Sequence, residues 1–234
     1  MNGKQSFVFS RNVAGDQQVD YNTLLDWSKA GGSRFVRLQL DSLGMGFTST
    51  GGVDANWVVQ WDQIFEKAEQ NGIYILPVFS VWYDWNTGPG YSTWKSNPLN
   101  VVNGGPAQTP AELFQNGSTT QKAWLSWMKD LVKHWQGRKN ILAWEIFSEV
   151  NLASGKTEAN GMELVNNAAS IIRANDSFHR PVTASIADTA RGLIFIGTHP
   201  LTLSICIHVR HQRNWIGQLS RRFVILLIYM KSHS

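Results

Sequence analysis

The chain has 234 residues, of which 43% are hydrophobic, 12% are aromatic and only 16% are charged. A chain of this length and composition can bury a large core, which excludes an intrinsically disordered or linker-like protein. Its one cysteine, Cys206, excludes an internal disulfide framework and any metal site built from several cysteines.

The net charge of +4 is divided unevenly along the chain. Residues 1–188 hold 15 Lys and Arg against 17 Asp and Glu, whereas residues 189–234 hold six Lys and Arg and no acidic residue. We therefore predict two parts: a globular domain over 1–188, and a non-native basic tail over 189–234 that packs on or beside it. Because the basic residues of the tail form no extended patch, they do not indicate a nucleic-acid partner.

No segment predicts membrane insertion or export. The apolar runs fall short of the roughly 18 residues of a transmembrane helix, and residues 1–6 contain no apolar signal-peptide core. We therefore expect no membrane partner and no signal peptide in this chain. Its compartment stays open, because a secreted parent protein whose signal has been removed would look the same.

Short apolar runs alternate with amphipathic segments over the first 188 residues, a pattern typical of βα units around a parallel sheet. Gly31 and Gly32, and later Asn71 and Gly72, mark helix ends. The long segment 82–117 is rich in Gly, Pro, Asn and aromatic residues, and loops of that length are commonly functional. The expected strands are 7–9, 34–40, 73–79, 141–147 and 181–185, and the expected helices are 20–30, 57–68, 119–135 and 158–174.

Five such strands fit either an open doubly wound sheet or part of a (β/α)8 barrel. A nucleotide-binding open sheet carries a Gly-rich phosphate loop after its first strand, but residues 10–15 contain a single glycine and no G-x-G-x-x-G motif. We therefore predict an α/β protein with an incomplete (β/α)8 TIM barrel, made of about five native βα units plus an atypical C-terminal tail.

The most informative segment is WEIFSEVNL, residues 144–152. It places two carboxylates, Glu145 and Glu149, at the carboxyl end of an otherwise apolar strand, which is where barrels place their chemistry. A buried glutamate there is a candidate general acid, because apolar surroundings can keep it protonated. The deeper Glu145 is expected to be a structural ion-pair partner, whereas Glu149 is the catalytic candidate.

This segment resembles the W-E-x-x-N-E motif on the fourth strand of clan A glycoside hydrolases, most nearly the cellulase-like family 5 group. Residues 35–38 (FVRL) resemble the family's second strand with its active-site arginine, and residues 72–78 resemble its third strand. The likeness spans about residues 7 to 188. It implies retaining hydrolysis of β-linked glycosides by two glutamates, with an oligo- or polysaccharide as the substrate. We expect no cofactor and no metal ion.

The resemblance also implies roles for individual residues. Glu149 matches the acid/base glutamate, and Arg37 matches the arginine that steadies the nucleophile in the family. Four aromatic residues of the long loop are candidate stacking surfaces for sugar rings, with ordinary loop packing as the alternative for each: Trp82, Tyr83, Trp85 and Trp94.

Two departures from the family pattern affect the expected activity. Ser148 stands where the family has Asn immediately before the acid/base glutamate, and its shorter side chain is expected to weaken a contact with the substrate hydroxyl next to the reacting carbon. No Glu follows Glu163, so the nucleophile expected on a seventh strand is missing. We therefore expect a truncated glycoside hydrolase-like protein with weak or no activity.

The unusual composition of the tail has a genetic interpretation. With allowed codons, residues 201–208 can be regrouped in another reading frame to give DFINMH, which resembles the family's sixth strand. We interpret residues from about Ala190 onward as an out-of-frame translation caused by the loss of one base near the Thr189 codon, which the encoding DNA would test. The uncharged apolar run 223–230 predicts a strand or an aggregation-prone segment. This run, or open sheet edges of the incomplete barrel, would support a homodimer.

Two further functions remain compatible with the sequence. A catalytically inactive carbohydrate-binding remnant would hold sugar on its aromatic loops without chemistry. A complete enzyme would instead use a different second carboxylate, namely Asp41, Asp84 or Glu145, within about 5 to 10 Å of Glu149.

Overall fold

Five parallel strands form the main sheet of the computed structural model, which describes residues 7–9, 21–187, 204–209 and 224–229. No helix in these ranges is long and apolar enough to cross a membrane. The strands and longer helices are, in chain order, β1 (Phe7–Phe9), α1 (Tyr21–Ala30), β2 (Phe35–Gln39), α2 (Ala55–Gln70), β3 (Tyr74–Val81), α3 (Thr119–Trp135), β4 (Trp144–Ser148), α4 (Glu158–Asn175), β5 (Val182–Thr183), β6 (Ser204–Val209) and β7 (Val224–Tyr229).

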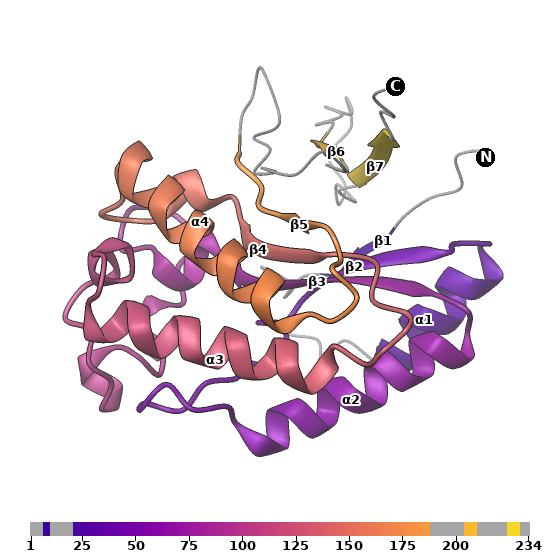
Figure 1. Ribbon diagram of the computed structural model, residues 1–234, viewed down its shortest axis with the longest axis horizontal. Coiled ribbons are helices and arrows are strands. Elements are labelled where there is room, and N and C mark those ends of the chain that lie inside the picture. The colour runs from indigo at the N-terminus through magenta and orange to yellow at the C-terminus, as the bar shows by residue number, and fades with distance from the viewer. Residues whose placement is uncertain (1–6, 10–20, 188–203, 210–223, 230–234) are drawn as a thin grey trace.

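The strands of the main sheet lie in the order in which the chain forms them, β1-β2-β3-β4-β5, and all neighbours are parallel. Helices α1 to α4 lie on one side of this sheet (Figure 1). A doubly wound sheet reverses its strand order and carries helices on both faces, so this alternative is excluded. Sequential parallel strands with their helices on one face are the arrangement of a (β/α)8 barrel, which confirms the predicted fold class.

The predicted elements of the domain are present, with shifted boundaries. Helix α2 begins at Ala55, two residues early, because the Asp54 side chain accepts hydrogen bonds from two backbone N–H groups of its first turn. Strand β4 begins at Trp144 rather than at residue 141, and Ile141 forms a single bridge to β3. The predicted loop 82–117 contains four short 3-10 turns, at Trp82–Trp85, Trp94–Ser96, Val101–Asn103 and Pro110–Phe114.

In the C-terminal part of the chain, β6 and β7 form an antiparallel pair that is separate from the main sheet. Strand β7 confirms the strand that the apolar run 223–230 predicts. The two-part division at residue 188, the out-of-frame origin of the tail and the homodimer stay predictions. Most of the tail lies outside the described residues.

Tryptophan side chains fill much of the space between the sheet and the helices. Trp57 and Trp61 of α2 and Trp124, Trp127 and Trp135 of α3 recur at helical spacing on one face of their helices, and all five are buried. Their indole N–H groups donate to buried or partly buried acceptors, which are Gly44 O for Trp57, Leu40 O for Trp61, Ser80 Oγ for Trp124, Gly46 O for Trp127 and Asp62 Oδ1 for Trp135. These five tryptophans therefore pack in the core with their N–H groups hydrogen-bonded.

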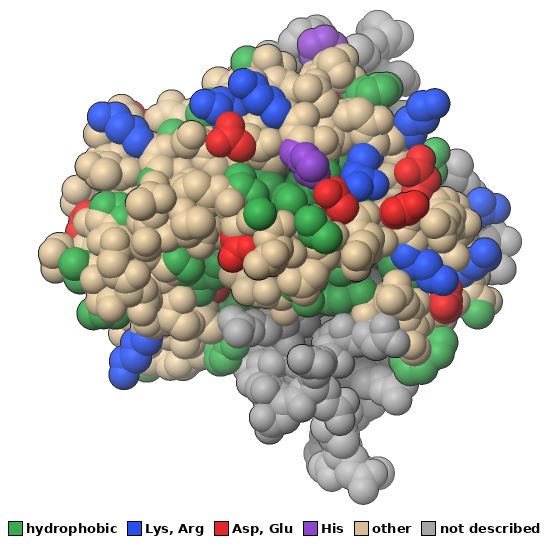
Figure 2. Space-filling view, turned by 90° about the horizontal axis from the view of Figure 1, so that it is seen from below, with side chains coloured by type: hydrophobic (Ala, Val, Ile, Leu, Met, Phe, Trp, Pro, Cys, Tyr) green, Lys and Arg blue, Asp and Glu red, His purple; other side chains and the backbone are tan. Residues whose placement is uncertain are grey.

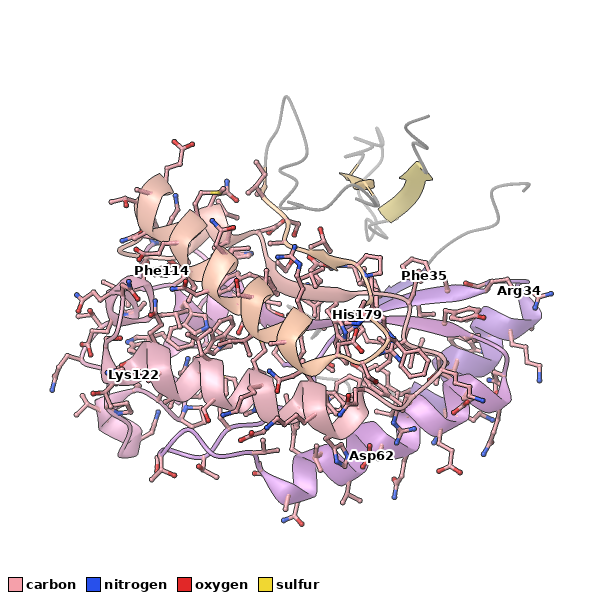
Figure 3. The ribbon with its side chains drawn as sticks, viewed as in Figure 1. Arg34, Phe35, Asp62, Phe114, Lys122 and His179 are labelled. Carbon is pink, nitrogen blue, oxygen red and sulfur yellow. The ribbon has the colours of Figure 1, made fainter. Side chains whose placement is uncertain are left out.

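Asp62 joins α2 to the end of α3 at the surface, as Figure 3 shows. It accepts hydrogen bonds from Trp135 Nε1 at 2.9 Å and from Arg138 Nη2 at 2.8 Å, and His134 Nε2 lies 2.9 Å away. Partial burial alone would raise the pKa of Asp62, but hydrogen bonds from His134, Trp135 and Arg138 lower it below its usual value. Elsewhere on this helical face, acidic and basic side chains are interspersed (Figure 2).

We expect Gly46→Ala to destabilise the protein more than Gly72→Ala. Both glycines have left-handed backbones, with φ of 73° and 66°, where alanine costs roughly 1 to 2 kcal/mol. A Cβ atom on Gly46 would lie 2.5 Å from the ring of Trp57, whereas nothing lies within 4 Å of one on Gly72. Overpacking adds about 1 to 3 kcal/mol at Gly46 only. Urea unfolding of the two variants measures the difference, and equal losses would contradict this account.

Candidate active site

The site begins with two charged residues on alternate strands of the sheet. Val36 packs in the core on the helix side, so Arg37, the next residue of β2, belongs to the opposite face. Arg37 is paired in register with Leu76 of β3, and Glu145 of β4 is paired with Val78 of β3. The register thus brings Arg37 and Glu145 close to each other across β3.

Arg37 and Glu145 form a buried ion pair with two hydrogen bonds. Arg37 Nε donates to Glu145 Oε2 at 2.6 Å, and Arg37 Nη2 donates to Glu145 Oε1 at 2.6 Å. Burial alone would lower the pKa of Arg37, but the charge of Glu145, its hydrogen bonds with Arg37 and the charge of Glu149 raise this pKa above its usual value. The pairing engages both oxygens of Glu145 and supports the interpretation of this residue as a structural ion-pair partner.

Ser148 belongs to the same buried cluster. Its Oγ accepts a hydrogen bond from Arg37 Nη2 at 2.9 Å, and the residue is only 4% exposed. The resemblance implies a substrate contact at this position, where the family has Asn, and the shorter serine side chain is expected to weaken it. In the structure the Ser148 oxygen is directed toward Arg37, and a contact with substrate stays a prediction.

Glu149 lies where β4 ends. Its backbone has φ 56° and ψ 47°, in the left-handed region, and the chain turns there into the 3-10 segment Val150–Leu152. The residue is half-buried, and its negative charge helps to raise the pKa of Arg37. Among the described residues, the Glu149 carboxylate makes no hydrogen bond, and only its backbone is held. A half-buried carboxylate at the end of a barrel strand is well placed to donate or accept a proton.

Ser185, two residues beyond β5, connects the two glutamates. Its hydroxyl donates to Glu145 Oε1 at 2.9 Å, and its oxygen accepts from the backbone N–H of Glu149 at 3.1 Å. Ser185 was not among the site residues predicted from the sequence. The signal was available, because Ser185 follows the fifth strand as Glu149 follows the fourth.

Tyr83 lies two residues beyond the end of β3, and its hydroxyl binds a carboxylate that follows β2. Its hydroxyl donates to Asp41 Oδ2 at 2.6 Å, and the Gln39 amide oxygen lies 3.4 Å away. Burial and the negative charges of Asp41 and Asp84 raise the pKa of Tyr83 far above its usual value. Tyr83 therefore stays neutral and acts as a hydrogen-bond donor.

The four aromatic candidates for sugar stacking differ in burial. Trp85 and Trp94 are buried in the core, with their ring centroids 5.8 Å apart, so neither ring presents a face to a ligand. Their burial favours the alternative of ordinary loop packing. Tyr83 is also buried, and its ring meets that of Trp82 edge to face at 5.8 Å. Trp82 is partly exposed and is the best placed of the four to contact a sugar.

The alternative second carboxylates already have partners. Asp41 is bound by Tyr83, the buried Asp84 accepts a hydrogen bond from Thr93 Oγ1 at 2.5 Å, and Glu145 is paired with Arg37. These contacts do not favour the alternative of a complete enzyme that uses one of them as its nucleophile. Within the described ranges, no three His, Cys, Asp or Glu side chains are arranged to hold a metal ion.

A pocket of about 210 Å³, which the sequence analysis did not predict, lies beside the turn that carries Glu149. It is bounded by that turn, the first turns of α4 and the chain just beyond β5. Glu149 is not among its lining residues, although the neighbouring Val150 is. Its lining residues are Val150, Asn151, Lys156, Thr157, Glu158, Gly161, Met162, Val165, Ala184 and Ile186.

No protein-family model and no curated protein matches this chain. Solved structures do match it. The endo-β-1,4-mannanase from Thermotoga petrophila is 14% identical with a TM-score of 0.53, over 77% of this chain and 41% of that one. GH5_18 from Streptomyces cattleya, in complex with GlcNAc, is 13% identical with a TM-score of 0.58, over 80% of this chain and 45% of that one. The endo-1,4-β-mannanase from Rhizomucor miehei is 15% identical with a TM-score of 0.52, over 77% of this chain and 55% of that one.

Identities this low establish a likeness of fold, and the match spans between 41% and 55% of each of these three proteins. The sequential parallel strands of this chain are themselves the arrangement that distinguishes a barrel from a doubly wound sheet. The resemblance on which the sequence analysis relied is thereby confirmed for the fold. This chain therefore shares part of the barrel fold of the family 5 glycoside hydrolases of clan A.

Proposed function

We propose that this chain is a glycoside hydrolase-like protein for β-linked oligo- or polysaccharides, with Glu149 as its acid/base residue. Glu149 would give its proton to the glycosidic oxygen as the bond between that oxygen and the anomeric carbon breaks. Arg37 and Glu145 would form the rigid floor of the site, and Trp82 would present an aromatic surface to a sugar ring.

The observation that carries this proposal is the Glu149 carboxylate at the carboxyl end of β4. It is half-buried, makes no hydrogen bond to the described residues and lies close enough to Arg37 to affect its pKa. The surrounding fold is that of enzymes whose names include endo-β-1,4-mannanases. Within the described part of the chain, Arg37 binds Glu145 and Ser148 of this cluster, while the Glu149 carboxylate is not engaged and can face a substrate.

The proposal includes a low activity for the chain on its own. A retaining mechanism needs a second carboxylate about 5 Å from the first, on the opposite face of the sugar. The resemblance places it as a glutamate on a seventh strand, and no Glu follows Glu163 in this sequence. A small anion such as azide can take over this role by attacking the anomeric carbon while the aryloxide leaves, which gives the α-glycosyl azide from a β-glycoside.

We therefore expect azide to accelerate the release of phenols from aryl β-mannosides or β-glucosides by the wild-type chain. Glu149→Gln should lower kcat/KM with azide by about 100-fold or more for phenyl glycosides, whose leaving group needs a proton. The loss should be small for 2,4-dinitrophenyl glycosides, whose leaving group departs without one. Glu66→Gln, at an exposed position of α2, is the matched control and should behave as wild type.

Equal rates for wild type and Glu149→Gln on both classes of substrate would remove the enzyme claim. The carbohydrate-binding alternative predicts a different result. Mannohexaose or cellohexaose would then shift the NMR signals of the protein, while azide would produce no turnover at all. Loss of these shifts in Trp82→Ala, at the partly exposed ring, would assign the bound sugar to this site.

A further inference from the structure

One serine side chain ties the candidate acid to the buried ion pair. The Ser185 hydroxyl donates its proton to Glu145 Oε1 at 2.9 Å, and the same oxygen accepts the backbone N–H of Glu149 at 3.1 Å. A serine hydroxyl has one donor and two acceptor positions, so both bonds form at once. Arg37 fixes Glu145, and Glu145 in turn fixes the Ser185 hydroxyl. The Ser185 oxygen therefore holds the backbone N–H of Glu149 in a defined place.

The backbone of Ser185 strengthens this connection. Its N–H donates to Phe147 O at 2.9 Å, and its carbonyl accepts from the N–H of Val150 at 3.1 Å. Strand β5 has only two residues, so these bonds extend its attachment to β4 beyond the regular ladder. Side chain and backbone together make four hydrogen bonds from Ser185 to the segment 145–150.

This attachment acts on a strained residue. Glu149 has φ 56°, a left-handed conformation that residues with a side chain adopt only when their surroundings impose it. The bonds from Ser185 reach the N–H of Glu149 and the N–H of the next residue, so they hold both sides of the turn. The direction of the Glu149 carboxylate depends on this turn, because its carboxylate makes no hydrogen bond to other described residues.

We infer that Ser185 is a positioning residue, which holds the backbone of Glu149 in the turn that aims its carboxylate at the leaving-group oxygen. This inference rests on the proposed function for its catalytic consequence. Its structural part, that Ser185 holds the Glu149 turn, can be tested without any activity. Ser185 itself touches no reacting atom.

The first test is amide hydrogen exchange of Glu149, measured by NMR in the full chain. Ser185→Ala should accelerate exchange of the Glu149 N–H by about tenfold or more, because this group loses its acceptor. Ser185→Thr keeps the hydroxyl and should retain the protection. Ser170→Ala removes an exposed serine of α4 that bonds within its own helix, and should leave Glu149 unchanged. Unchanged exchange in Ser185→Ala would overturn the inference.

The second test uses the dependence of the rate on the leaving group, with azide present as above. Ser185→Ala should lower kcat by about 10- to 100-fold for phenyl glycosides, while KM changes little and dinitrophenyl glycosides lose much less. Ser185→Thr should return kcat toward the wild-type value. A protein that is merely less folded would lose the same factor on both substrates, and that result would overturn the positioning role.

The two proposals fail in distinguishable ways. If the wild-type chain turns over neither substrate with azide, the proposed function fails, while amide exchange still decides whether Ser185 holds the Glu149 turn. If Glu149→Gln shows the loss that depends on the leaving group and Ser185→Ala does not, the proposed function stands and the positioning role is wrong.

Discussion

Replacing Arg37 with Met is expected to lower the free energy of unfolding by about 3 to 5 kcal/mol. The substitution leaves Glu145, whose side chain is 0% exposed, without the cation that binds both of its oxygens. Among the described residues, the Ser185 hydroxyl is then the one remaining hydrogen-bond donor to Glu145. An uncompensated buried carboxylate is among the most destabilising changes in a protein core.

Two further variants distinguish the effect of leaving Glu145 unpaired from the effect of losing the packing of the arginine side chain. The double variant Arg37→Met with Glu145→Met removes both charges, and it should be more stable than Arg37→Met alone. Arg34→Met is the matched control, because Arg34 is exposed at the edge of the molecule (Figure 3), and its effect should stay within about 0.5 kcal/mol.

Urea unfolding of the four proteins, followed by tryptophan fluorescence, gives their free energies of unfolding. A double variant that is no more stable than Arg37→Met would show that packing of the arginine stem, rather than its charge, supports the core. A loss below about 1 kcal/mol in Arg37→Met would show that Glu145 is not held as a buried anion.

The different roles of Glu145 and Glu149 were predictable from the sequence. The position of a carboxylate along a strand indicates whether it is buried and needs a partner, or lies at the strand end. Glu145 lies four residues before Glu149, inside an apolar run, so it required a buried partner, and the structure supplies Arg37. The alternation of apolar residues along β2 also placed this arginine within a strand. These inferences depend on local patterns, which a single sequence shows directly.

The contacts of Ser185 were not predictable, because they depend on the register between β4 and β5 and on the left-handed turn at Glu149. No local pattern reports that a glutamate adopts a positive φ, a conformation that residues other than glycine rarely take. The sequence suggested a polar residue at the end of a strand, and only the pairing of the strands shows that its hydroxyl reaches both glutamates.

The loop after β3 shows the same limit for aromatic residues. Its length and its Gly, Pro and Asn content predicted a functional loop and left open whether each aromatic residue is exposed or packed. In the structure, asparagine side chains bind backbone groups of the loop. Asn97 Nδ2 donates to Asp84 O, and Asn100 Nδ2 donates to Trp94 O, both at 3.0 Å. With its polar backbone satisfied in this way, the loop can bury Trp85 and Trp94. Composition alone cannot distinguish a buried loop from an exposed one.

The largest loss of stability is expected for Trp127→Ala, because Trp127 of α3 lies at the centre of the aromatic core. Its ring meets Phe47 edge to face at 4.8 Å and Phe79 at 6.0 Å, and it is fully buried. Removing a buried Trp costs about 3 to 5 kcal/mol through lost contacts and a cavity. The Gly46 carbonyl, which accepts the indole N–H at 2.9 Å, would also lose its partner, at a cost of about 1 kcal/mol or more.

A loss of this size approaches the whole stability of an ordinary domain, about 5 to 15 kcal/mol, so Trp127→Ala should unfold at much lower temperature or urea concentration than wild type. Trp27→Ala is the matched control, because Trp27 of α1 is 66% exposed and should change stability by about 0.5 kcal/mol or less. Trp127→Phe keeps an aromatic ring but lacks the N–H, and should fall between the two. If Trp27→Ala were as destabilising as Trp127→Ala, the aromatic layer between sheet and helices would not be the main source of stability.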